Sequence, residues 1–169
     1  MVTAAPRAAL RPALEVAAEV PDPELPMLTL ADLGVLAAVE QQGDAVTAWL
    51  TPTYSGCPAV AEMAADLAGR LRAAGYREVD VRLRLDPPWS TDLITEAGRA
   101  KLAAAGIAPP HAAASSPGLL TLGRTRLAVV CPQCGSRETE ELSRFGSTSC
   151  KALWRCRECR EPFERIKEI

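Results

Sequence analysis

The sequence has few aromatic residues and only one histidine, and these shortages exclude several kinds of active site. Phe, Trp and Tyr together number seven among 169 residues. Because the single histidine, His111, lies in a segment without periodicity, no Ser-His-Asp triad or Cys-His pair can be placed on a rigid element. A Glu-x-x-His motif for a di-iron centre and a glycine-rich phosphate loop are also absent. We expect a chain with no catalytic site of its own.

Long hydrophobic runs and an export signal are missing as well. Arg7 and Arg11 interrupt the short Ala-rich stretches at the N-terminus, and no apolar run approaches the roughly 18 residues that a membrane span requires. We therefore expect a cytoplasmic protein that does not interact with a membrane. In that reducing compartment, the six cysteines fit metal-bound thiolates better than disulfides.

Two CxxC pairs near the C-terminus form the most specific pattern in the chain. Cys131 and Cys134 make the first pair, Cys156 and Cys159 make the second, and 21 residues separate the pairs. Each CxxC turn brings two sulfurs to one side of a tight knuckle, so four thiolates can converge on one tetrahedral Zn²⁺. A closed site of this kind is structural. The sequence therefore predicts a zinc ribbon over residues 124–169.

The charge distribution argues against a nucleic-acid partner. Up to residue 123 the chain has 9 basic and 14 acidic side chains, and the remainder has 10 and 7. Four thiolates with one Zn²⁺ would bring the net charge of the ribbon to about +1, which is poor support for binding a phosphate backbone. We expect no nucleic-acid partner.

Residues 1–110 predict a small α+β domain that precedes the ribbon. Apolar residues recur at helical spacing in three segments and alternate with polar residues in the strands. We predict a small mixed sheet with helices on one face. Residues 111–123, rich in Ala, Ser, Pro and Gly, predict a linker to the ribbon. The helices are expected over 8–19, 60–75 and 90–105, and the strands over 35–40, 45–50 and 78–86.

Cys57 is the strongest candidate for chemistry outside the ribbon. Pro58 suits the first position of a helix, so we expect the Cys57 thiol at a helix N-terminus, where the thiolate is favoured. The alternative is a buried cysteine that packs as a small hydrophobe, and residue chemistry alone leaves both interpretations open. Thr53 could supply a hydroxyl beside the thiol, although a turn residue needs no such role.

Two carboxylates and a fifth thiol near the ribbon are further candidates. Asp22 and Glu24 lie in a proline-rich loop, where they could bind iron or could merely cap and solvate the loop. Cys150 lies between the CxxC pairs and could be a spare ligand or part of the loop packing. Lys151 follows it directly and would favour its thiolate.

Several motifs together resemble a known family. The first part of the chain resembles the small domain of the metal–sulfur cluster biosynthesis family. With the second part included, the chain is similar to one branch of that family, the PaaD proteins that accompany phenylacetyl-CoA epoxidase. The match begins near residue 10 and has both modules in the same order. The segments that carry it are 22–26, 32–34, 50–58, 87–89, 106–110, 131–135, 145–153 and 159–163.

The resemblance implies an accessory protein of aerobic phenylacetate degradation. Such a protein would assist the assembly or repair of iron–sulfur or di-iron centres in oxygenase and reductase subunits. Cys57 would be the functional cysteine of the family and Asp22 and Glu24 its acidic motif, with iron or a cluster held transiently. A homodimer is left open. The alternatives are a non-catalytic scaffold that docks the oxygenase through the zinc ribbon, and a thiol oxidoreductase.

Overall fold

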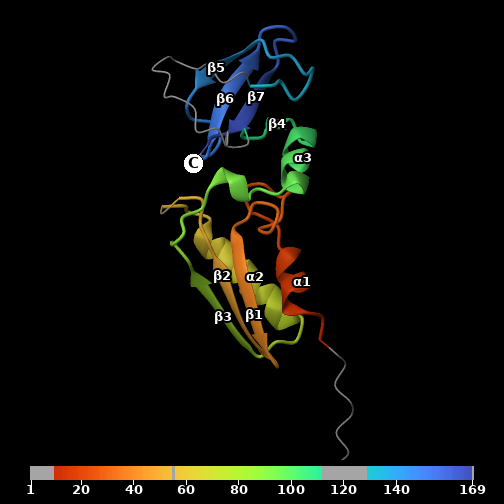
Figure 1. Ribbon diagram of the computed structural model, residues 1–169, viewed down its shortest axis with the longest axis vertical. Coiled ribbons are helices and arrows are strands. Elements are labelled where there is room, and N and C mark those ends of the chain that lie inside the picture. The colour runs from red at the N-terminus through yellow and green to blue at the C-terminus, as the bar shows by residue number, and fades with distance from the viewer. Residues whose placement is uncertain (1–9, 55, 112–128, 169) are drawn as a thin grey trace, which may run out of the picture.

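The computed structural model describes residues 10–54, 56–111 and 129–168, which form two sheets stacked end to end (Figure 1). The first sheet has the order β1-β2-β3, with β1 antiparallel and β3 parallel to β2. The second has the order β4-β7-β6-β5. The predicted α+β class, a mixed sheet followed by a ribbon, is confirmed. The strands are β1 (Leu36–Gln42), β2 (Ala45–Leu50), β3 (Glu78–Leu83), β4 (Ile107–Ala108), β5 (Thr139–Ser143), β6 (Lys151–Cys156) and β7 (Pro162–Ile166).

Two helices, α1 (Ala13–Ala18) and α2 (Val60–Ala73), cover the first sheet. α1 contacts both β1 and α2, and α2 contacts β3 (Figure 1). The predicted helix over 8–19 begins only at Ala13, because Pro12 has extended backbone angles and disfavours helix in the residue before it. Residues 8 and 9 of that prediction lie outside the described residues.

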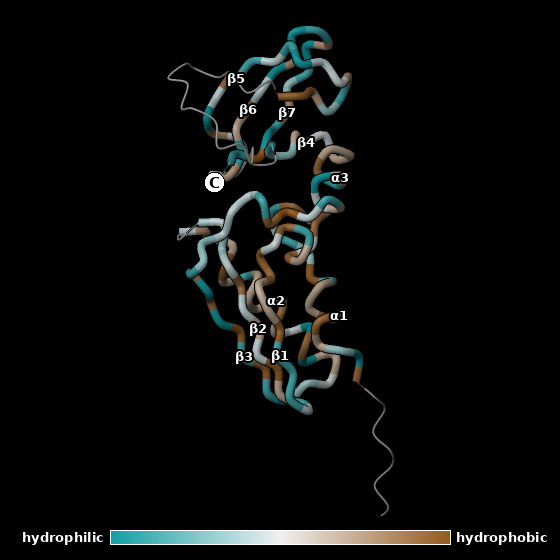
Figure 2. Tube along the Cα trace, in the orientation of Figure 1, coloured by the Kyte–Doolittle hydropathy of each residue, from teal (hydrophilic) through white to brown (hydrophobic). Residues whose placement is uncertain are grey.

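The core of the first domain follows the predicted alternation of β2. Val46, Ala48 and Leu50 are buried, and they share one hydrophobic cluster with Leu67 and Leu71 of α2. Burial of each large aliphatic side chain contributes roughly 2 kcal/mol, so this cluster supplies much of the driving force for the fold. Hydrophobic positions are concentrated in this part of the molecule (Figure 2).

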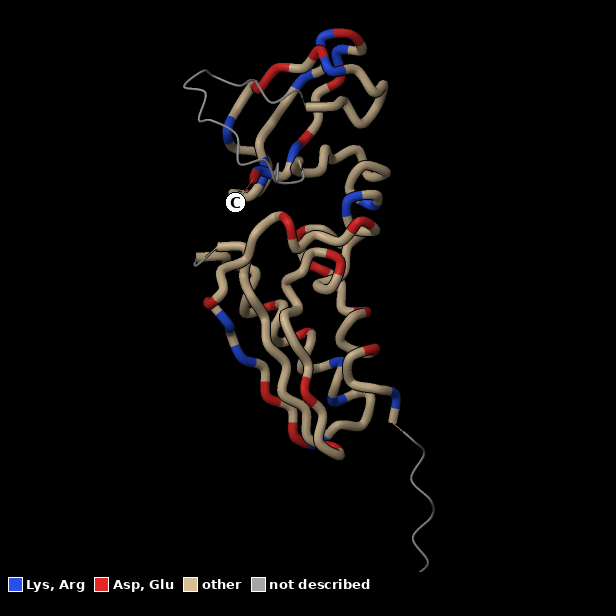
Figure 3. The backbone as a smooth tube through the Cα atoms, viewed as in Figure 1, with Lys and Arg blue, Asp and Glu red and all other residues tan. Residues whose placement is uncertain are grey.

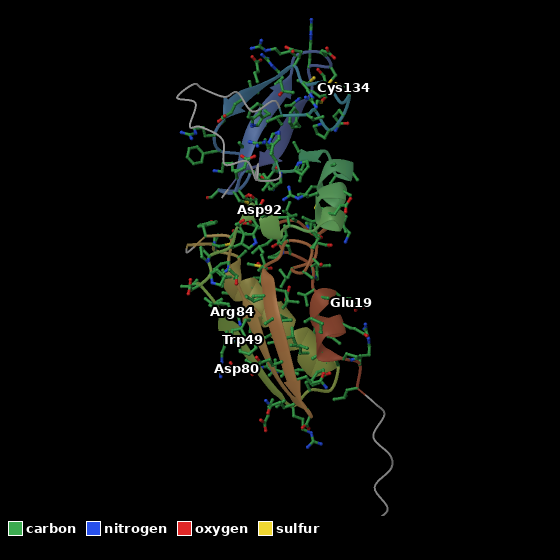
Figure 4. The ribbon with its side chains drawn as sticks, in the orientation of Figure 1. Glu19, Trp49, Asp80, Arg84, Asp92 and Cys134 are labelled. Carbon is green, nitrogen blue, oxygen red and sulfur yellow. The ribbon has the colours of Figure 1, made fainter. Side chains whose placement is uncertain are left out.

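The predicted apolar face of β3 is shorter in the structure. Val79 and Val81 pack against the core, but Leu83 is 53% and Leu85 is 62% exposed. Leu85 lies beyond the end of β3, and Leu83 is exposed although it pairs with Leu50, so the half-buried part of the strand ends at Val81. Nearby, the Arg84 guanidinium lies 5.6 Å from the centre of the Trp49 ring (Figure 4).

The segment after β3 connects the two sheets. It contains a short 3₁₀ helix, η1 (Thr91–Leu93), and then α3 (Glu96–Ala104), which leads into β4. β4 pairs in parallel with β7, so residues within the range assigned to the first domain add a strand to the ribbon sheet. Ile166 of β7 in turn packs in the core of the first domain. The predicted linker over 111–123 lies, apart from His111, outside the described residues.

Close contacts hold the loop at 32–34 against the segment that contains η1. The Trp89 indole N–H donates to the Leu33 carbonyl at 2.9 Å. Gly34 has a φ of 69°, and a Cβ there would lie 2.5 Å from the carbonyl oxygen of Leu93. A side chain at position 34 would therefore push these two segments apart.

No helix among the described residues is long and apolar enough to cross a membrane.

Candidate functional site

The four cysteines of the two CxxC pairs converge in the ribbon. Their sulfurs all lie within 4.8 Å of one another, with 3.7 Å between Cys131 and Cys159 and 3.5 Å between Cys134 and Cys156. A tetrahedral site with zinc–sulfur bonds of about 2.3 Å requires sulfur–sulfur distances of about 3.8 Å. The arrangement therefore fits a metal ion of that geometry. Figure 4 shows Cys134 in the part of the ribbon that lies away from the first sheet.

The electrostatics of this cluster favour a bound cation. Burial opposes ionisation of Cys156, but the N–H groups of Cys159 and Glu158 lower its pKa to about 7. The Glu161 N–H also lowers the pKa of Cys159, yet burial and the neighbouring thiols raise that pKa to about 12. A bound cation would favour the thiolate form of these cysteines by compensating their negative charge. The convergence of the four sulfurs is suited to binding a metal ion.

A second group of candidate residues lines a cavity between the two domains. The cavity has a volume of about 30 Å³ and is walled mostly by apolar side chains, among them Leu33, Trp89 and Ile94. It brings together five predicted site residues from different parts of the chain. These residues are Asp22, Glu24, Thr53, Cys57 and Cys150.

Asp22 and Glu24 occupy different environments in the loop between α1 and β1. Asp22 is only 7% exposed, and its Oδ1 accepts hydrogen bonds from the N–H groups of Glu24 and Leu25 at 2.9 and 2.8 Å. The proline-rich loop is closed by an antiparallel bridge between Pro21 and Thr29. Burial is the largest influence on Asp22 and raises its pKa. Glu24 is exposed.

Cys57 lies in the turn between β2 and α2, as predicted, but its thiolate is not favoured. Burial raises the pKa of Cys57, and the negative charges of Glu24 and Asp22 raise it further. Hydrogen bonds from the Ala59 N–H and the Thr53 hydroxyl act in the opposite direction and are outweighed. The N–H at the start of the helix does lower the pKa of Cys57, but burial and the two carboxylates outweigh it, so the net shift is opposite to the one expected for an activated thiol. Without a cation nearby, Cys57 is a protonated thiol.

Cys150 enters the cavity from the ribbon, directly before β6. Its carbonyl accepts a hydrogen bond from the Lys167 N–H at 2.9 Å, which joins this residue to the end of β7. Its sulfur lies 3.0 Å from the Thr148 hydroxyl oxygen. The sequence left Cys150 open as either a ligand or packing, and the structure brings it to the same cavity as Cys57.

Lys151 is a buried residue whose influence on Asp22 the sequence did not reveal. It is 4% exposed, and its ammonium lies 3.3 Å from the Glu164 carboxylate and 3.0 Å from the Ser147 hydroxyl. Its charge also lowers the pKa of Asp22, although less than burial raises that pKa. The sequence placed Lys151 only beside Cys150, because its nearness to Asp22 depends on how the two domains pack.

The cavity differs from the cysteine cluster in how tightly its potential ligands converge. Among the described residues, a group of three or more ligand atoms within 4.8 Å of one another occurs at the four cysteines and not at the cavity. A wider groove adjoins the cavity, and Glu24 lines both. Figure 3 shows acidic positions in the loops of the first domain on the side of the ribbon. The cavity thus gathers thiol and carboxylate side chains whose ligand atoms are farther apart than those of the cysteine cluster.

Comparisons with known proteins agree with this two-part structure. The family model described as an iron–sulfur cluster assembly protein matches residues 7–86, and the one described as a PaaD zinc beta ribbon domain matches residues 115–167. The chain is thus an iron–sulfur cluster assembly domain joined to a zinc ribbon.

At the level of the particular family, the chain belongs to the PaaD family of phenylacetyl-CoA epoxidase subunits. A protein of Escherichia coli (strain K12), provisionally named as the D component of 1,2-phenylacetyl-CoA epoxidase, is 42% identical over 151 residues. The match covers 89% of this chain and 88% of that protein. The resemblance inferred from the motifs is confirmed.

Two solved structures are similar to part of the chain. A domain of unknown function from Bacillus anthracis is 24% identical with a TM-score of 0.49, covering 53% of this chain and 87% of that one. A Mycobacterium tuberculosis protein associated with Fe–S complex assembly and repair is 30% identical with a TM-score of 0.32, covering 55% of this chain and 82% of that one.

Proposed function

We propose that this chain is an accessory protein of a phenylacetyl-CoA epoxidase that assists the assembly or repair of iron–sulfur or di-iron centres in its partner subunits. The similarity to the E. coli protein over nearly the whole of both chains supports the link to the epoxidase. The match to the iron–sulfur cluster assembly family supports the maturation role. The observation that carries the proposal is the cavity that gathers Cys57 with Asp22 and Glu24.

In this proposal Cys57 holds iron or a cluster temporarily, and the carboxylates favour entry of the cation. A protonated Cys57 binds metal only when its proton leaves, and the incoming positive charge lowers the thiol pKa enough for this to happen. The raised pKa therefore makes binding weaker and more easily reversed than at a permanently ionised thiol. A carrier needs this property, because its cargo must leave again.

The ribbon cysteines have a separate role. We assign a structural Zn²⁺ to Cys131, Cys134, Cys156 and Cys159, which agrees with the distances between their sulfurs. A site closed by four protein ligands has no open position for chemistry. We expect one zinc per chain that remains bound when iron is removed.

The partners in this proposal are the oxygenase and reductase subunits of the epoxidase, and the work takes place in the cytoplasm. A reducing compartment is required because Cys57 and the cluster cysteines act as free thiols or metal ligands.

Partner maturation tests this function. The chain is co-expressed with the oxygenase and reductase subunits, and the iron and sulfide content of the purified partners is measured together with epoxidase activity. Cys57→Ser should lower the metal content of the partners, while Ile94→Val, which trims the wall of the same cavity by one methyl group, should not. If partner subunits co-expressed with the Cys57→Ser variant were fully metallated, the proposal would be wrong.

A scaffold role is the second candidate, and one surface feature favours it. Phe145 in the ribbon is 73% exposed and lines the groove beside the cavity together with Tyr54. Under this alternative, Phe145→Asp abolishes binding to the partner subunits while Cys57→Ser changes neither binding nor maturation. Deleting the ribbon is a poor test, because Ile166 belongs to the core of the first domain.

A further inference from the structure

The cavity contains two thiols, and they come from different domains. Cys57 belongs to the turn before α2, whereas Cys150 belongs to the ribbon loop before β6, and both line the same space. Neither is among the four cysteines that converge elsewhere in the ribbon. Both are half-buried and reduced. The structure thus presents a pair of soft ligands at the contact between the domains.

A third potential ligand is already oriented by the backbone. Asp22 is more than nine-tenths buried, and the hydrogen bonds that it accepts from Glu24 and Leu25 both end on Oδ1. Within the part of the chain that the structure describes, no donor to Oδ2 is found, while the carboxylate borders the cavity. Oδ2 can therefore accept from water or bind a cation that enters the cavity.

The size of the cavity limits what can bind there. A single water molecule needs about 10–15 Å³ measured in the same way, so a cavity of about 30 Å³ has room for one metal ion with one or two small ligands. An iron–sulfur cluster contains at least two iron and two sulfide atoms and does not fit unless the domains separate. The volume therefore favours a single ion.

The charges also suit a divalent ion. Two thiolates and the Asp22 carboxylate carry one negative charge more than a divalent cation neutralises, and the buried ammonium of Lys151 acts on the same carboxylate. A mixed set of sulfur and oxygen ligands suits borderline metals such as ferrous iron better than Mg²⁺ or Ca²⁺. Exposed Glu24, which lines both the cavity and the open groove, lies on a route between this position and solvent.

We propose that Cys57 and Cys150, with Asp22, form an interdomain site for one ferrous ion, so that the ribbon supplies a ligand as well as a fold. This inference rests on the proposed function and specifies its cargo. Binding releases the two thiol protons to solvent, and the iron remains ferrous throughout. Release to an acceptor is an exchange of ligands that involves no electron transfer. Because the ligand atoms do not yet converge, the side chains close around the ion as it enters.

Anaerobic binding of Fe²⁺ to the full-length, zinc-loaded protein tests the inference. The affinity is measured by competition with a chromophoric chelator, and metal analysis gives the zinc content of each variant. We expect one Fe²⁺ per chain and an affinity loss of at least about tenfold for both Cys57→Ser and Cys150→Ser. Ser149→Ala, an exposed neighbour of Cys150, is the control and should bind like the wild type.

A second measurement counts the thiolates without relying on one variant. Both metal sites are loaded with Co²⁺, whose thiolate charge-transfer absorption grows with the number of bound thiolates. Six thiolates in the wild type against four in the double variant Cys57→Ser/Cys150→Ser predict an intensity ratio of about 1.5. Equal intensities would overturn the site even if a single variant folded poorly.

Several outcomes separate this inference from the proposed function. Unchanged iron binding by Cys150→Ser would overturn the interdomain site while leaving Cys57 as a carrier. Iron bound with stoichiometric sulfide would overturn the single ion in favour of a cluster. If the wild type bound no iron but Cys57→Ser still impaired partner maturation, the inference would fail and the proposed function would stand.

Discussion

At the scale of single residues, Asp22 shows how the ligand position that we propose conflicts with stability. Its carboxylate is buried, and burial raises its pKa more than Lys151 and two backbone N–H groups lower it. The ionised form is therefore less stable in the folded protein than in water. The Asx-type turn that the side chain makes with Glu24 and Leu25 explains a polar residue here but not a charged one. A negative charge is useful at this point if a cation is to enter the cavity.

Asp22→Asn should make the iron-free protein more stable and weaken its affinity for iron. Asparagine can still accept both backbone hydrogen bonds, while the cost of the buried charge is removed. We expect a gain of about 1 kcal/mol, which corresponds to a rise of about 2–4 °C in Tm for a chain of this size. Thermal unfolding of the zinc-loaded, iron-free protein measures this change in Tm, and the exposed substitution Glu24→Gln is the control. A lower Tm would mean that attraction to Lys151 outweighs burial.

Asp32 illustrates the opposite case, a carboxylate whose charge stabilises the fold. Its Oδ2 accepts from the Thr29 N–H at 2.9 Å and from the Lys101 ammonium at 2.6 Å. Burial alone would raise its pKa, but these groups together hold the pKa below the ordinary 3.8. A depressed pKa contributes stability that is present above pH 3.8 and is lost as the pH falls through the lower folded value.

Asp32→Asn should therefore destabilise the protein at neutral pH and lose much of this effect in acid. Because Lys101 is about half exposed, we expect a cost of only about 1 kcal/mol at pH 7. Urea unfolding of the wild type and the variant at pH 7 and near pH 3 measures the difference, with exposed Asp66→Asn as the control. An equal gap at both pH values would assign the loss to hydrogen-bond geometry and not to charge.

At the scale of elements, α3 approaches the loop at 32–34 more closely than side chains normally permit. Gly98 lies in the first turn of α3, and a Cβ there would be 2.7 Å from the Asp32 carbonyl oxygen. The Thr95 hydroxyl caps this helix by accepting from the Gly98 N–H, and the Thr95 N–H donates to the Asp32 carbonyl. The contact holds the wall of the cavity that includes Leu33.

Two glycine-to-alanine substitutions should have opposite signs. In α2, Gly69 has open space around it, so Gly69→Ala should stabilise by roughly 0.5–1 kcal/mol, as expected for an unobstructed helix position. Gly98→Ala should instead cost roughly 1–3 kcal/mol, because α3 must move away from the Asp32 backbone. Chemical denaturation of both variants gives the comparison. Stabilisation by Gly98→Ala would show that the loop moves freely.

The elements that the sequence predicted well are those whose partners are near in the chain. The β1–β2 hairpin and α2 follow from alternation and helical spacing, because their packing repeats locally. The candidate site was only partly predictable. Cys57, Asp22 and Glu24 were predicted from motifs, but the raised pKa of Cys57 depends on burial beside two carboxylates from another segment. The approach of Cys150 depends on packing between domains, which local periodicity does not encode.

At the scale of the whole molecule, the ribbon closes the cavity of the first domain. Cys150 at the start of β6 and Ile166 at the end of β7 both line that cavity, and the Lys167 N–H ties the two strand ends together. The cysteine cluster lies elsewhere in the ribbon (Figure 4). Buried Cys131 and Cys156 belong to the small core of the ribbon, so a metal there stabilises the sheet whose other end covers Cys57.

Removal of zinc should therefore expose Cys57, which is not a zinc ligand in our assignment. Binding of a structural zinc is worth on the order of 10 kcal/mol, which the small ribbon core cannot replace, so β5 to β7 should unfold when a chelator extracts the metal. The cavity then loses Cys150 and Ile166 from its lining, and the alkylation rate of Cys57 should rise at least about tenfold, since reaction requires access to the thiol.

Mass spectrometry of alkylated peptides before and after chelation measures this rate. Hydrogen exchange in α2, which should remain protected, separates opening of the cavity from unfolding of the first domain. If zinc leaves and the alkylation rate of Cys57 does not change, the ribbon does not close the site. Iron binding should in turn affect the zinc site. A ferrous ion held between Cys57 and Cys150 would bind only while the folded ribbon packs on the first domain, and it would therefore slow the loss of zinc.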